Sequence, residues 1–500
     1  MNQLESSKRQ RMSKSRLPQV LTAGALALLA GCSMIPAYER PAAPVAASYP
    51  ATGSAAHTAD APAASAVAWQ DFFADARLRR LIALSLDNNR DLRVAVLNIE
   101  QARAQYQIRR ADQLPTVNGV LSGSRMPASN GGSTTLYNVG LAVTAYELDF
   151  FGRVSSLKEA ALSQYLASEE GRKTAQISLI AAVANTYLSM LADEELQAIT
   201  RQTLTTREDS LKLSKLRFDS GVTSELDFRQ AESLLEAARV AYAQQQRQRA
   251  LDENALTLLL GQPLGSELLG ASASGPSAAA QAMPLAQPMA DVPAGLPSDL
   301  LISRPDIRQA EQLLLASNAN IGAARAAFFP RISLTVGAGS ASGQLSGLLK
   351  SGSWGFTMAP QLLLPIFDAG RNQAGLDSAK VGRDIAIAQY EKAIQTAFRE
   401  VADALATRST LVDQLQSQQR QANAEAIRFK LSDLRYRNGV ASYLDLLDAQ
   451  RSLFSAQQAV VQTRLAQLQS QVTLYKTLGG GWKEADQGAL ILRTDPISKP

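Results

Sequence analysis

Apolar and polar residues alternate along four runs of the chain, and each run predicts a β-strand. The clearest run is RISLTVGAG (331–339), in which Ile, Leu, Val and Ala share one face and Ser, Thr and Gly share the other. LYNVGLAVTA (136–145) and SWGFTMAPQLLLP (353–365) alternate in the same way, while the run after Pro115 is less regular. The segments between paired runs, 125–135 and 340–352, are polar and rich in Gly and Ser, which predicts hairpin loops.

Two very long helices follow the strand pairs. From Gly152 to about Arg217 the chain has no proline and one interior glycine, Gly171, and residues 371–437 repeat this length. A helix of that size spans about 100 Å at 1.5 Å per residue, and it is not stable without packing along a partner. An apolar stripe in 177–192 predicts coiled-coil packing against the helix that returns after the turn. Each pair of helices is therefore expected to form a long hairpin.

The chain contains an internal repeat. LRFDSGVTSELDFRQAES (216–233) and LRYRNGVASYLDLLDAQR (434–451) align at an offset of 218, and earlier positions align at 215. The change of offset indicates a loop of variable length between Pro115 and Gly152. Each half has the order helix, two strands, long helix, Gly-Val turn and long helix. We assign the first repeat to 79–261, an inter-repeat linker to 262–303, the second repeat to 304–481 and a C-terminal tail to 482–500.

The first 31 residues have the layout of a signal peptide. Basic residues precede an apolar run, Val20–Ala30, that is too short to span a bilayer. The run ends in Leu-Ala-Gly-Cys, which resembles a lipoprotein box and predicts a covalent lipid on Cys32, the only cysteine. The alternative is an incidental cysteine beside an ordinary cleavage site. The next residue is Ser33 and not the Asp that favours retention at the inner membrane, so we expect the protein at the outer membrane. Residues 32–78 would form a lipidated tether and equatorial segment.

Export to the outer membrane changes the interpretation of the strands. A structure that spans that membrane by strands must be a closed barrel, and four strands are too few, since the smallest such barrels have 8. Several copies must then contribute strands, and three copies would supply 12. The alternative is a sheet outside the membrane with one wet face.

The arrangement resembles the TolC-type outer membrane efflux family, and the lipoprotein box with YRNGVASYLDLLDAQRSLFSAQQ and LYKTLGGGW most resembles its OprM-type lipoprotein branch. The resemblance implies a mainly α fold with a transmembrane β part. The expected assembly is a homotrimer with a 12-stranded β-barrel, a long α-helical periplasmic barrel and a mixed α/β equatorial belt. It also implies a periplasmic membrane-fusion adaptor, an inner membrane pump of the RND type and outer membrane lipid as partners.

The sequence contains few of the residue patterns that catalytic sites require. The single histidine, His57, lies in a low-complexity stretch, and no phosphate-binding loop or metal-ligand motif is present. We therefore predict that the chain is not an enzyme and has no cofactor besides the lipid on Cys32. Removal of residues 1–31 also removes most of the formal charge of +5, so the charge does not indicate nucleic acid.

The helix after the second turn carries a candidate gate instead. Leu444, Asp448 and Arg451 are spaced i, i+4 and i+7, so they share one face. In a trimer, three leucines could close a pore, while Asp448 and Arg451 form bridges that a partner opens; the alternative is an ordinary solvated pair. The first repeat has Leu226, Gln230 and Ser233 at these positions. The family resemblance adds Arg435 and Tyr436 to the gate.

The turns are the candidate adaptor contacts. They comprise Gly221, Val222 and Thr223 in the first repeat and Gly439, Val440 and Ala441 in the second. Glycine is explained by a tight reversal, but an exposed valine is not. The family resemblance and the missing catalytic groups together imply a passive, gated exit duct for drugs and other small molecules. The alternatives are a channel for metal ions or type I protein secretion, a non-conducting structural coiled-coil lipoprotein, and an anchored enzyme, which the missing catalytic groups disfavour.

Overall fold

The computed structural model describes residues 33–49, 64–127, 131–265, 289–290, 292 and 297–483. The signal peptide, Cys32, His57, most of the inter-repeat linker and nearly all of the C-terminal tail lie outside these residues. The chain divides into two compact units. Unit 1 consists of the described parts of 1–42, 98–168 and 309–390, and unit 2 of the described parts of 43–97, 169–308 and 391–500.

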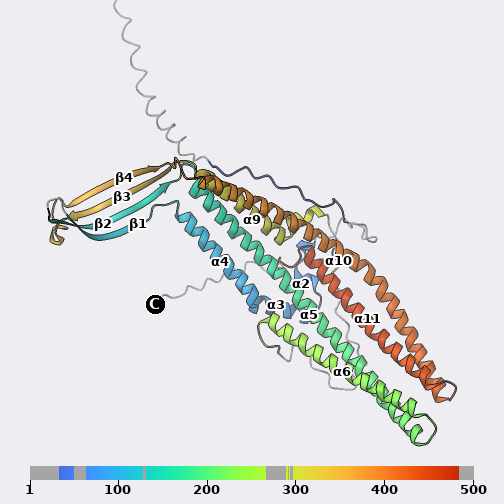
Figure 1. Ribbon diagram of the computed structural model, residues 1–500. Coiled ribbons are helices and arrows are strands. Elements are labelled where there is room, and N and C mark those ends of the chain that lie inside the picture. Colours follow the sequence, from blue (N-terminus) through green and yellow to red (C-terminus); the bar gives the residue numbers. More distant parts are fainter. Residues whose placement is uncertain are drawn as a thin grey trace, which may run out of the picture. The chain divides into compact units, whose positions relative to one another are not determined.

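Unit 1 contains one four-stranded antiparallel sheet in the order β1-β2-β3-β4 (Figure 1). The strands are β1 (Val117–Pro127), β2 (Ser133–Leu148), β3 (Arg331–Ser342) and β4 (Trp354–Leu363). The prediction of two strand pairs is confirmed, including the less regular run after Pro115. The predicted loops were too long at their ends, because residues 125–127, 133–135 and 340–342 continue the ladders, and a short 3-10 helix (Leu345–Gly347) lies in the second loop.

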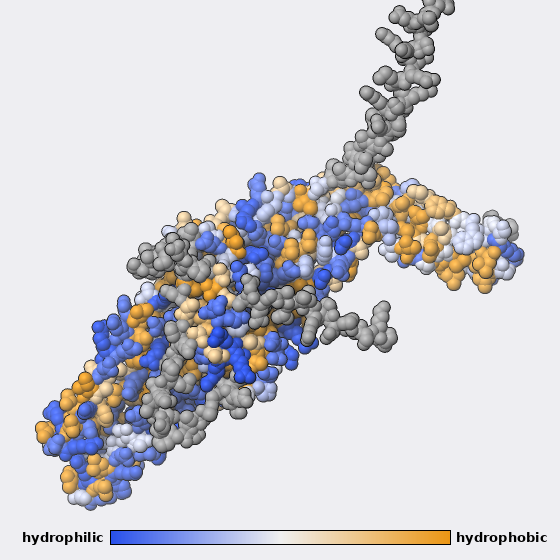
Figure 2. Space-filling view, turned by 180° about the vertical axis from the view of Figure 1, so that it is seen from behind, coloured by the Kyte–Doolittle hydropathy of each residue, from blue (hydrophilic) through white to orange (hydrophobic). Residues whose placement is uncertain are grey.

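The strand register gathers the apolar residues on one face. Val139 lies opposite Leu121, Val336 opposite Met358, and Ala338 opposite Phe356. A bulge between Val143 and Tyr146 keeps both residues on this face, since Tyr146 pairs with Leu334. In the single chain the face is open: Leu121 is 75% exposed and Phe356 66%. Figure 2 shows apolar residues gathered on the sheet.

The other face carries mainly small and polar residues, with the apolar exceptions Val120, Met126, Leu136 and Leu363. Gly140 and Gly339 lie directly opposite each other. A Cβ at Gly140 would approach the Ala338 oxygen to 2.4 Å, and one at Gly339 would approach the Val139 oxygen to 2.3 Å. The close approach of β2 and β3 therefore requires glycine at both positions.

The two long helices are as continuous as the sequence predicts. α5 (Arg153–Asp219) and α10 (Arg371–Arg437) have 67 residues each, and both run from unit 1 into unit 2. α4 (Arg90–Ala111) and α9 (Pro305–Ala326) precede the strand pairs. Gly152 and Gly370, with φ of 70° and 86°, stand immediately before α5 and α10.

The N-terminal segment 33–40 is packed along α9. The Asn318 side chain donates a hydrogen bond to the Pro36 oxygen at 2.8 Å, and Arg325 donates to the Met34 oxygen at 3.3 Å. Arg40 binds Glu311 through two hydrogen bonds of 2.7 and 2.8 Å. The segment lacks helix and strand, as a tether should, but it is docked rather than free. The sequence does not predict this docking, because hydrogen bonds to backbone carbonyls produce no periodic pattern of apolar residues.

In unit 2 each long helix is followed by a return helix (Figure 1), namely α6 (Glu225–Leu260) and α11 (Tyr443–Thr477). The short helices are α2 (Trp69–Phe72), α3 (Ala76–Asn88), α8 (Leu300–Ser303) and the 3-10 helices Ala64–Ala66 and Pro297–Asp299. Phe72 stacks on Tyr475 with ring centroids 3.9 Å apart. Arg304, buried before α9, binds Asp306, Glu400 and the Thr477 oxygen.

The predicted apolar stripe of α5 is buried as expected. Its residues are at most 4% exposed; they are Ile180, Val183, Ala184, Tyr187, Leu188 and Leu191. The expected partner was the return helix alone. The structure adds α11 of the second hairpin, since Ala192 and Leu196 pack with Val461, and Gln469 donates a hydrogen bond to Ser189 Oγ at 3.1 Å. A helix pattern reports which face is buried but not which helix covers it.

Candidate functional site

Both hairpin turns end their first helix in the same hydrogen-bonded motif. At the first turn, Gly221 N–H donates to the Phe218 oxygen and Val222 N–H to the Arg217 oxygen, each at 2.9 Å. At the second, Gly439 N–H donates to the Tyr436 oxygen at 3.0 Å. These are Schellman motifs, whose C′ residue is left-handed, and the glycines have φ of 69° and 71°. The motif accounts for both glycines.

The residues after each turn cap the next helix. Ser224 Oγ accepts a hydrogen bond from Asp227 N–H at 3.2 Å, and Ser442 Oγ accepts one from Asp445 N–H at the same distance. Thr223 Oγ1 donates to the Asp227 carboxylate at 2.7 Å, and this bond is the main reason that the pKa of Asp227 is lowered. Thr223 therefore stabilises the turn.

The two tip valines have no such role within the chain. Val222 is 74% exposed and Val440 is 69% exposed. In a Schellman motif the residue at this position often packs on the third or fourth residue from the helix end. The third residues are Arg217 and Arg435 and the fourth are Leu216 and Leu434, yet both valines stay exposed. Both tips thus present an uncovered apolar side chain.

The candidate gate residues fall into two groups. Leu444 is 60% exposed, and Asp448, Arg451 and Arg435 are also exposed on the second hairpin. Asp448 forms an ion pair with Arg428 of α10 and not with Arg451 three residues along its own helix. The structure thus adds Arg428, which also binds Glu425 at 3.2 Å.

A sequence signal for Arg428 was available. Arg428 and Asp448 each lie ten residues from Asn438, so a hairpin that turns at Asn438 places them opposite each other. In the first repeat the corresponding residues are Ser210 and Gln230, which cannot form an ion pair. The pair therefore belongs to the second hairpin.

Tyr436 lies in the interior, unlike the other candidate gate residues. It is 9% exposed and belongs to an apolar cluster with Tyr443, Leu446, Leu447, Ala231 and Leu234. Its ring lies 5.3 Å from that of Tyr443, and the Arg217 guanidinium stacks over it at 4.6 Å from the centroid. Because Ala231, Leu234 and Arg217 come from the first hairpin, Tyr436 joins the two hairpins near their tips.

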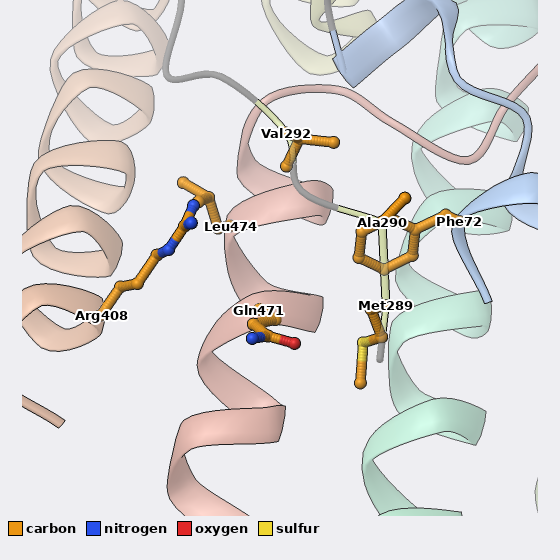
Figure 3. A pocket seen from close by; sticks show the side chains of 7 residues that line it. All are labelled: Phe72, Met289, Ala290, Val292, Arg408, Gln471 and Leu474. Carbon is orange, nitrogen blue, oxygen red and sulfur yellow. The ribbon is translucent and has the colours of Figure 1, made fainter. Parts of the chain in front are cut away.

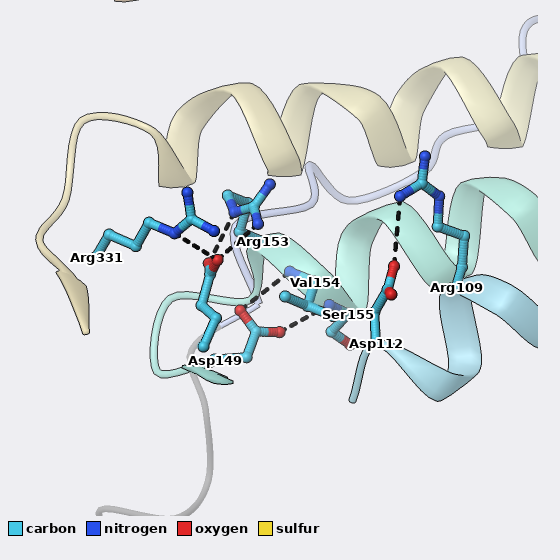
Figure 4. A network of polar contacts seen from close by, with 8 residues as sticks. Arg109, Asp112, Asp149, Arg153, Val154, Ser155 and Arg331 are labelled. Atoms are coloured by element: carbon cyan, nitrogen blue, oxygen red, sulfur yellow. Dashed lines mark hydrogen bonds and ion pairs between the residues drawn. The ribbon is translucent and has the colours of Figure 1, made fainter. Parts of the chain in front are cut away.

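A polar network in unit 1 joins the sheet to α5 (Figure 4). Glu147, at the end of β2, accepts two hydrogen bonds from Arg153 at 2.7 and 2.6 Å and pairs with Arg331 at 2.7 Å. The Asp149 carboxylate accepts hydrogen bonds from the N–H groups of Val154 and Ser155 at 3.1 and 2.7 Å, which satisfies donors at the start of α5. The network fixes the strand-to-helix connection.

Two small cavities occur in unit 2. The first, of about 250 Å³, is lined by Phe72, Met289, Ala290, Val292, Arg408, Gln471 and Leu474 (Figure 3), and the second is about 200 Å³. Both are smaller than typical ligand pockets of roughly 300–1,000 Å³. Among the described residues no group of three or more His, Cys, Asp or Glu side chains could hold a metal ion. The candidate functional features of the described residues are therefore the exposed sheet and the hairpin tips.

Comparisons with known proteins agree with that emphasis. The family model described as "Outer membrane efflux protein" matches residues 81–262 and 296–480. The chain is 50% identical over 484 residues to the toluene efflux pump outer membrane protein TtgC of Pseudomonas putida, covering 95% of this chain and 97% of TtgC. The antibiotic efflux pump outer membrane protein ArpC, also of Pseudomonas putida, has the same identity and coverage.

A solved structure shares the fold over most of its length. The open state of the Neisseria gonorrhoeae MtrE outer membrane channel matches with a TM-score of 0.80 and 41% identity, covering 91% of this chain and 100% of that chain. With the family model spanning most of both repeats, the chain belongs to the outer membrane efflux protein family.

Proposed function

We propose that the protein is the outer membrane channel of a tripartite efflux pump and acts as a passive exit duct, not as an enzyme. The observation that carries the proposal is the sheet. It exposes an apolar face, with Trp354 65% and Met358 61% exposed, and among the described residues the outer edges of its two edge strands, β1 and β4, have no neighbouring strand. Open edges and an open apolar face are unstable in water but suit a barrel that other copies complete in a membrane.

The proposed assembly is a homotrimer. Four strands per chain cannot close a transmembrane barrel, and three copies would give 12 strands. The same three copies would contribute six helical hairpins to a periplasmic tube. The lipid proposed on Cys32 would add a membrane anchor, because residues 33–40 dock on α9 with Met34 beside Arg325, near the end of that helix that leads into β3.

The tips are proposed to contact the periplasmic adaptor. Gly221 and Gly439 shape the turns, whereas Val222 and Val440, with Thr223 and Ala441 beside them, would form the contact surface. A single chain offers two similar but unequal tips. The adaptor would connect the channel to an inner membrane pump of the RND type, and substrate selection would lie in that pump.

Leu444, Asp448 and Arg451, with Arg435, are proposed as the gate at the periplasmic end. Their side chains are exposed on the second hairpin, as a water-filled constriction requires. Tyr436 would act from the interior by holding the hairpins together. Because relatives at 50% identity are named for toluene and antibiotic efflux, drugs and small apolar molecules are the proposed solutes, ahead of metal ions or secreted proteins.

Single-channel recording in planar bilayers tests the proposal. The purified protein should migrate as a detergent-resistant trimer and conduct weakly, and Asp448→Ala or Arg428→Ala should raise its conductance. A protein that stays monomeric in mild detergent would refute the barrel. A trimer whose variants all fail to conduct would favour the structural lipoprotein. Antibiotic accumulation in cells that lack the gene, with and without complementation, tests the solute class.

A further inference from the structure

Arg207 of α5 is a buried cation without a counter-charge. The residue is 5% exposed, its Nη1 donates a hydrogen bond to the Leu234 oxygen at 2.8 Å, and its Nε has no partner. Its guanidinium lies over the Phe454 ring of α11, 5.5 Å from the centroid. Among the described residues no carboxylate pairs with it. Burial of a charge in this state opposes packing, because hydration is lost and no opposite charge replaces it.

The charged group that faces Arg207 is a second arginine. Arg451 lies on α11 one turn before Phe454, the ring that Arg207 covers, and its side chain is exposed. Burial, followed by the charge of Arg451, lowers the pKa of Arg207. Both side chains remain charged at neutral pH, since arginine does not lose its proton in proteins. The contact between α5 and α11 therefore brings two like charges together, one of them desolvated.

The second hairpin avoids this cost. The residue that corresponds to Arg207 at the repeat offset is Glu425, which lies within 3.2 Å of Arg428. Arg428 also binds Asp448. Arg428 of the second hairpin thus has two carboxylates as partners, whereas Arg207 and Arg451, which come from different hairpins, carry the same charge.

We propose that Arg207 and Arg451 form an arginine pair that disfavours the packed arrangement of the two hairpins and so biases the periplasmic end toward opening. The apolar cluster around Tyr436 opposes this bias by holding the same helices together. Because the two effects oppose each other, a contact at the tips that favours one arrangement can shift the equilibrium between packed and separated hairpins. The inference rests on the proposed function, because it concerns regulation of the proposed gate.

Chemical cross-linking of two cysteines measures hairpin packing without requiring conduction. Ser210 Oγ and Gln450 Nε2 lie 3.5 Å apart between α5 and α11, so the double variant Ser210→Cys/Gln450→Cys reports on this contact. Because the glutamine side chain is long and a disulfide needs Cα atoms within roughly 7 Å, the two thiols are joined with a short bifunctional thiol reagent. Arg207→Met in that background keeps the length of the side chain and removes its charge. We expect the cross-link to form at least threefold faster, while Arg207→Lys, which keeps the charge, stays within twofold of the parent.

Arg239→Met is the matched control. Arg239 is half exposed on α6 and pairs with Glu236 at 2.7 Å and with Glu208 of α5 at 3.9 Å. Both contacts lie within the first hairpin, so the loss of Arg239 should leave the rate of cross-linking between α5 and α11 unchanged. An unchanged or slower rate in Arg207→Met would overturn the proposal, because Arg207 would then be neutral or would stabilise packing through Leu234. A faster rate in both Arg207→Met and Arg239→Met would also overturn it.

A second variant tests the same bias by adding the missing charge. Gln450 contacts Ser210, which lies one helical turn from Arg207, so Gln450→Glu places a carboxylate near Arg207. In planar bilayers this variant should lower the open probability at least threefold, as should Arg207→Met. An unchanged open probability in Gln450→Glu would overturn the proposal. If the parent protein itself does not conduct, the proposed function fails, and the cross-linking rates still decide the role of the arginine pair.

Discussion

Asp448 of α11 is paired with Arg428 of α10, so the second hairpin is closed by an ion pair that links its two helices. Both side chains are about half exposed, at 56% and 46%, and water should screen the pair. Its effect is therefore expected on the position of the helices more than on global stability. The pair gives the proposed gate a connection within one chain.

Removal of either partner should open the gate to a similar extent. We expect Asp448→Ala and Arg428→Ala each to raise single-channel conductance several-fold, with little change in thermal stability. The double variant should match the single variants, because the two residues act through one contact. Gln230→Ala, at the corresponding place in the first hairpin, is the control and should have no effect. An effect of Asp448→Ala alone would show that Asp448 acts through a different partner.

The tip valines should matter for partner binding and not for folding. Val222→Asp and Val440→Asp place a charge on side chains that are 74% and 69% exposed, so thermal stability should change by less than about 0.5 kcal/mol. Antibiotic efflux from cells should fall, and adaptor recovered with the protein after cross-linking should decrease. Normal efflux in the double variant would remove the valines from the contact surface.

Gly322 should be required for docking of the N-terminal segment. A Cβ at this position would lie 2.6 Å from Ser156 Oγ and 2.9 Å from the Ile35 nitrogen. Overpacking of this kind costs about 1–3 kcal/mol, so Gly322→Ala should accelerate amide hydrogen exchange in residues 33–40 by about tenfold or more.

Gly382 of α10 provides the matched control for Gly322. Nothing lies within 4 Å of a Cβ built on Gly382, so Gly382→Ala should leave exchange in 33–40 unchanged. It should also stabilise the exposed helix by up to about 1 kcal/mol. Equal exchange rates in both variants would mean that the segment does not depend on close approach at Gly322.

Asp193 should make stability depend on pH near neutrality. The residue is 7% exposed on α5, and burial, followed by the Asp252 carboxylate, raises the pKa of Asp193 to about 7. Arg249 opposes this shift and Glu194 adds to it. A raised carboxyl pKa means that the folded state favours the protonated form. The stability that protonated Asp193 contributes is complete below its pKa in the unfolded chain, about 3.9, and is lost as pH rises through its folded pKa of about 7.

Thermal unfolding of the purified protein at several pH values measures this contribution. From pH 5 to pH 8 the midpoint of the wild type should fall by about 2 °C or more, and Asp193→Asn should flatten the dependence. Glu253→Gln, which removes a carboxylate that lies 3.6 Å from Arg249, should retain it. A midpoint of the wild type that does not change with pH would contradict the raised pKa of Asp193.

The sequence by itself determined the elements and their order. Period-2 alternation located three of the strands, and the order of the internal repeat located the fourth, the less regular run after Pro115. The absence of proline located both 67-residue helices, and the repeated Gly-Val motif located both turns. These features are local, because backbone periodicity and turn chemistry depend on residues near one another in the chain. The placement of Leu444, Asp448 and Arg451 on one helix face follows from the same local geometry.

Only the tertiary structure decided which segments meet. It paired Asp448 with Arg428 and buried Tyr436 between the hairpins. It also packed α5 against α11 in addition to its own return helix α6. It docked residues 33–40 on α9 and buried Arg207 where no carboxylate of the described residues pairs with it. A stripe of apolar residues states that a face is buried, but several helices of similar pattern compete to cover it. The choice among them depends on packing across the whole chain, where side chains far apart in sequence must fit together.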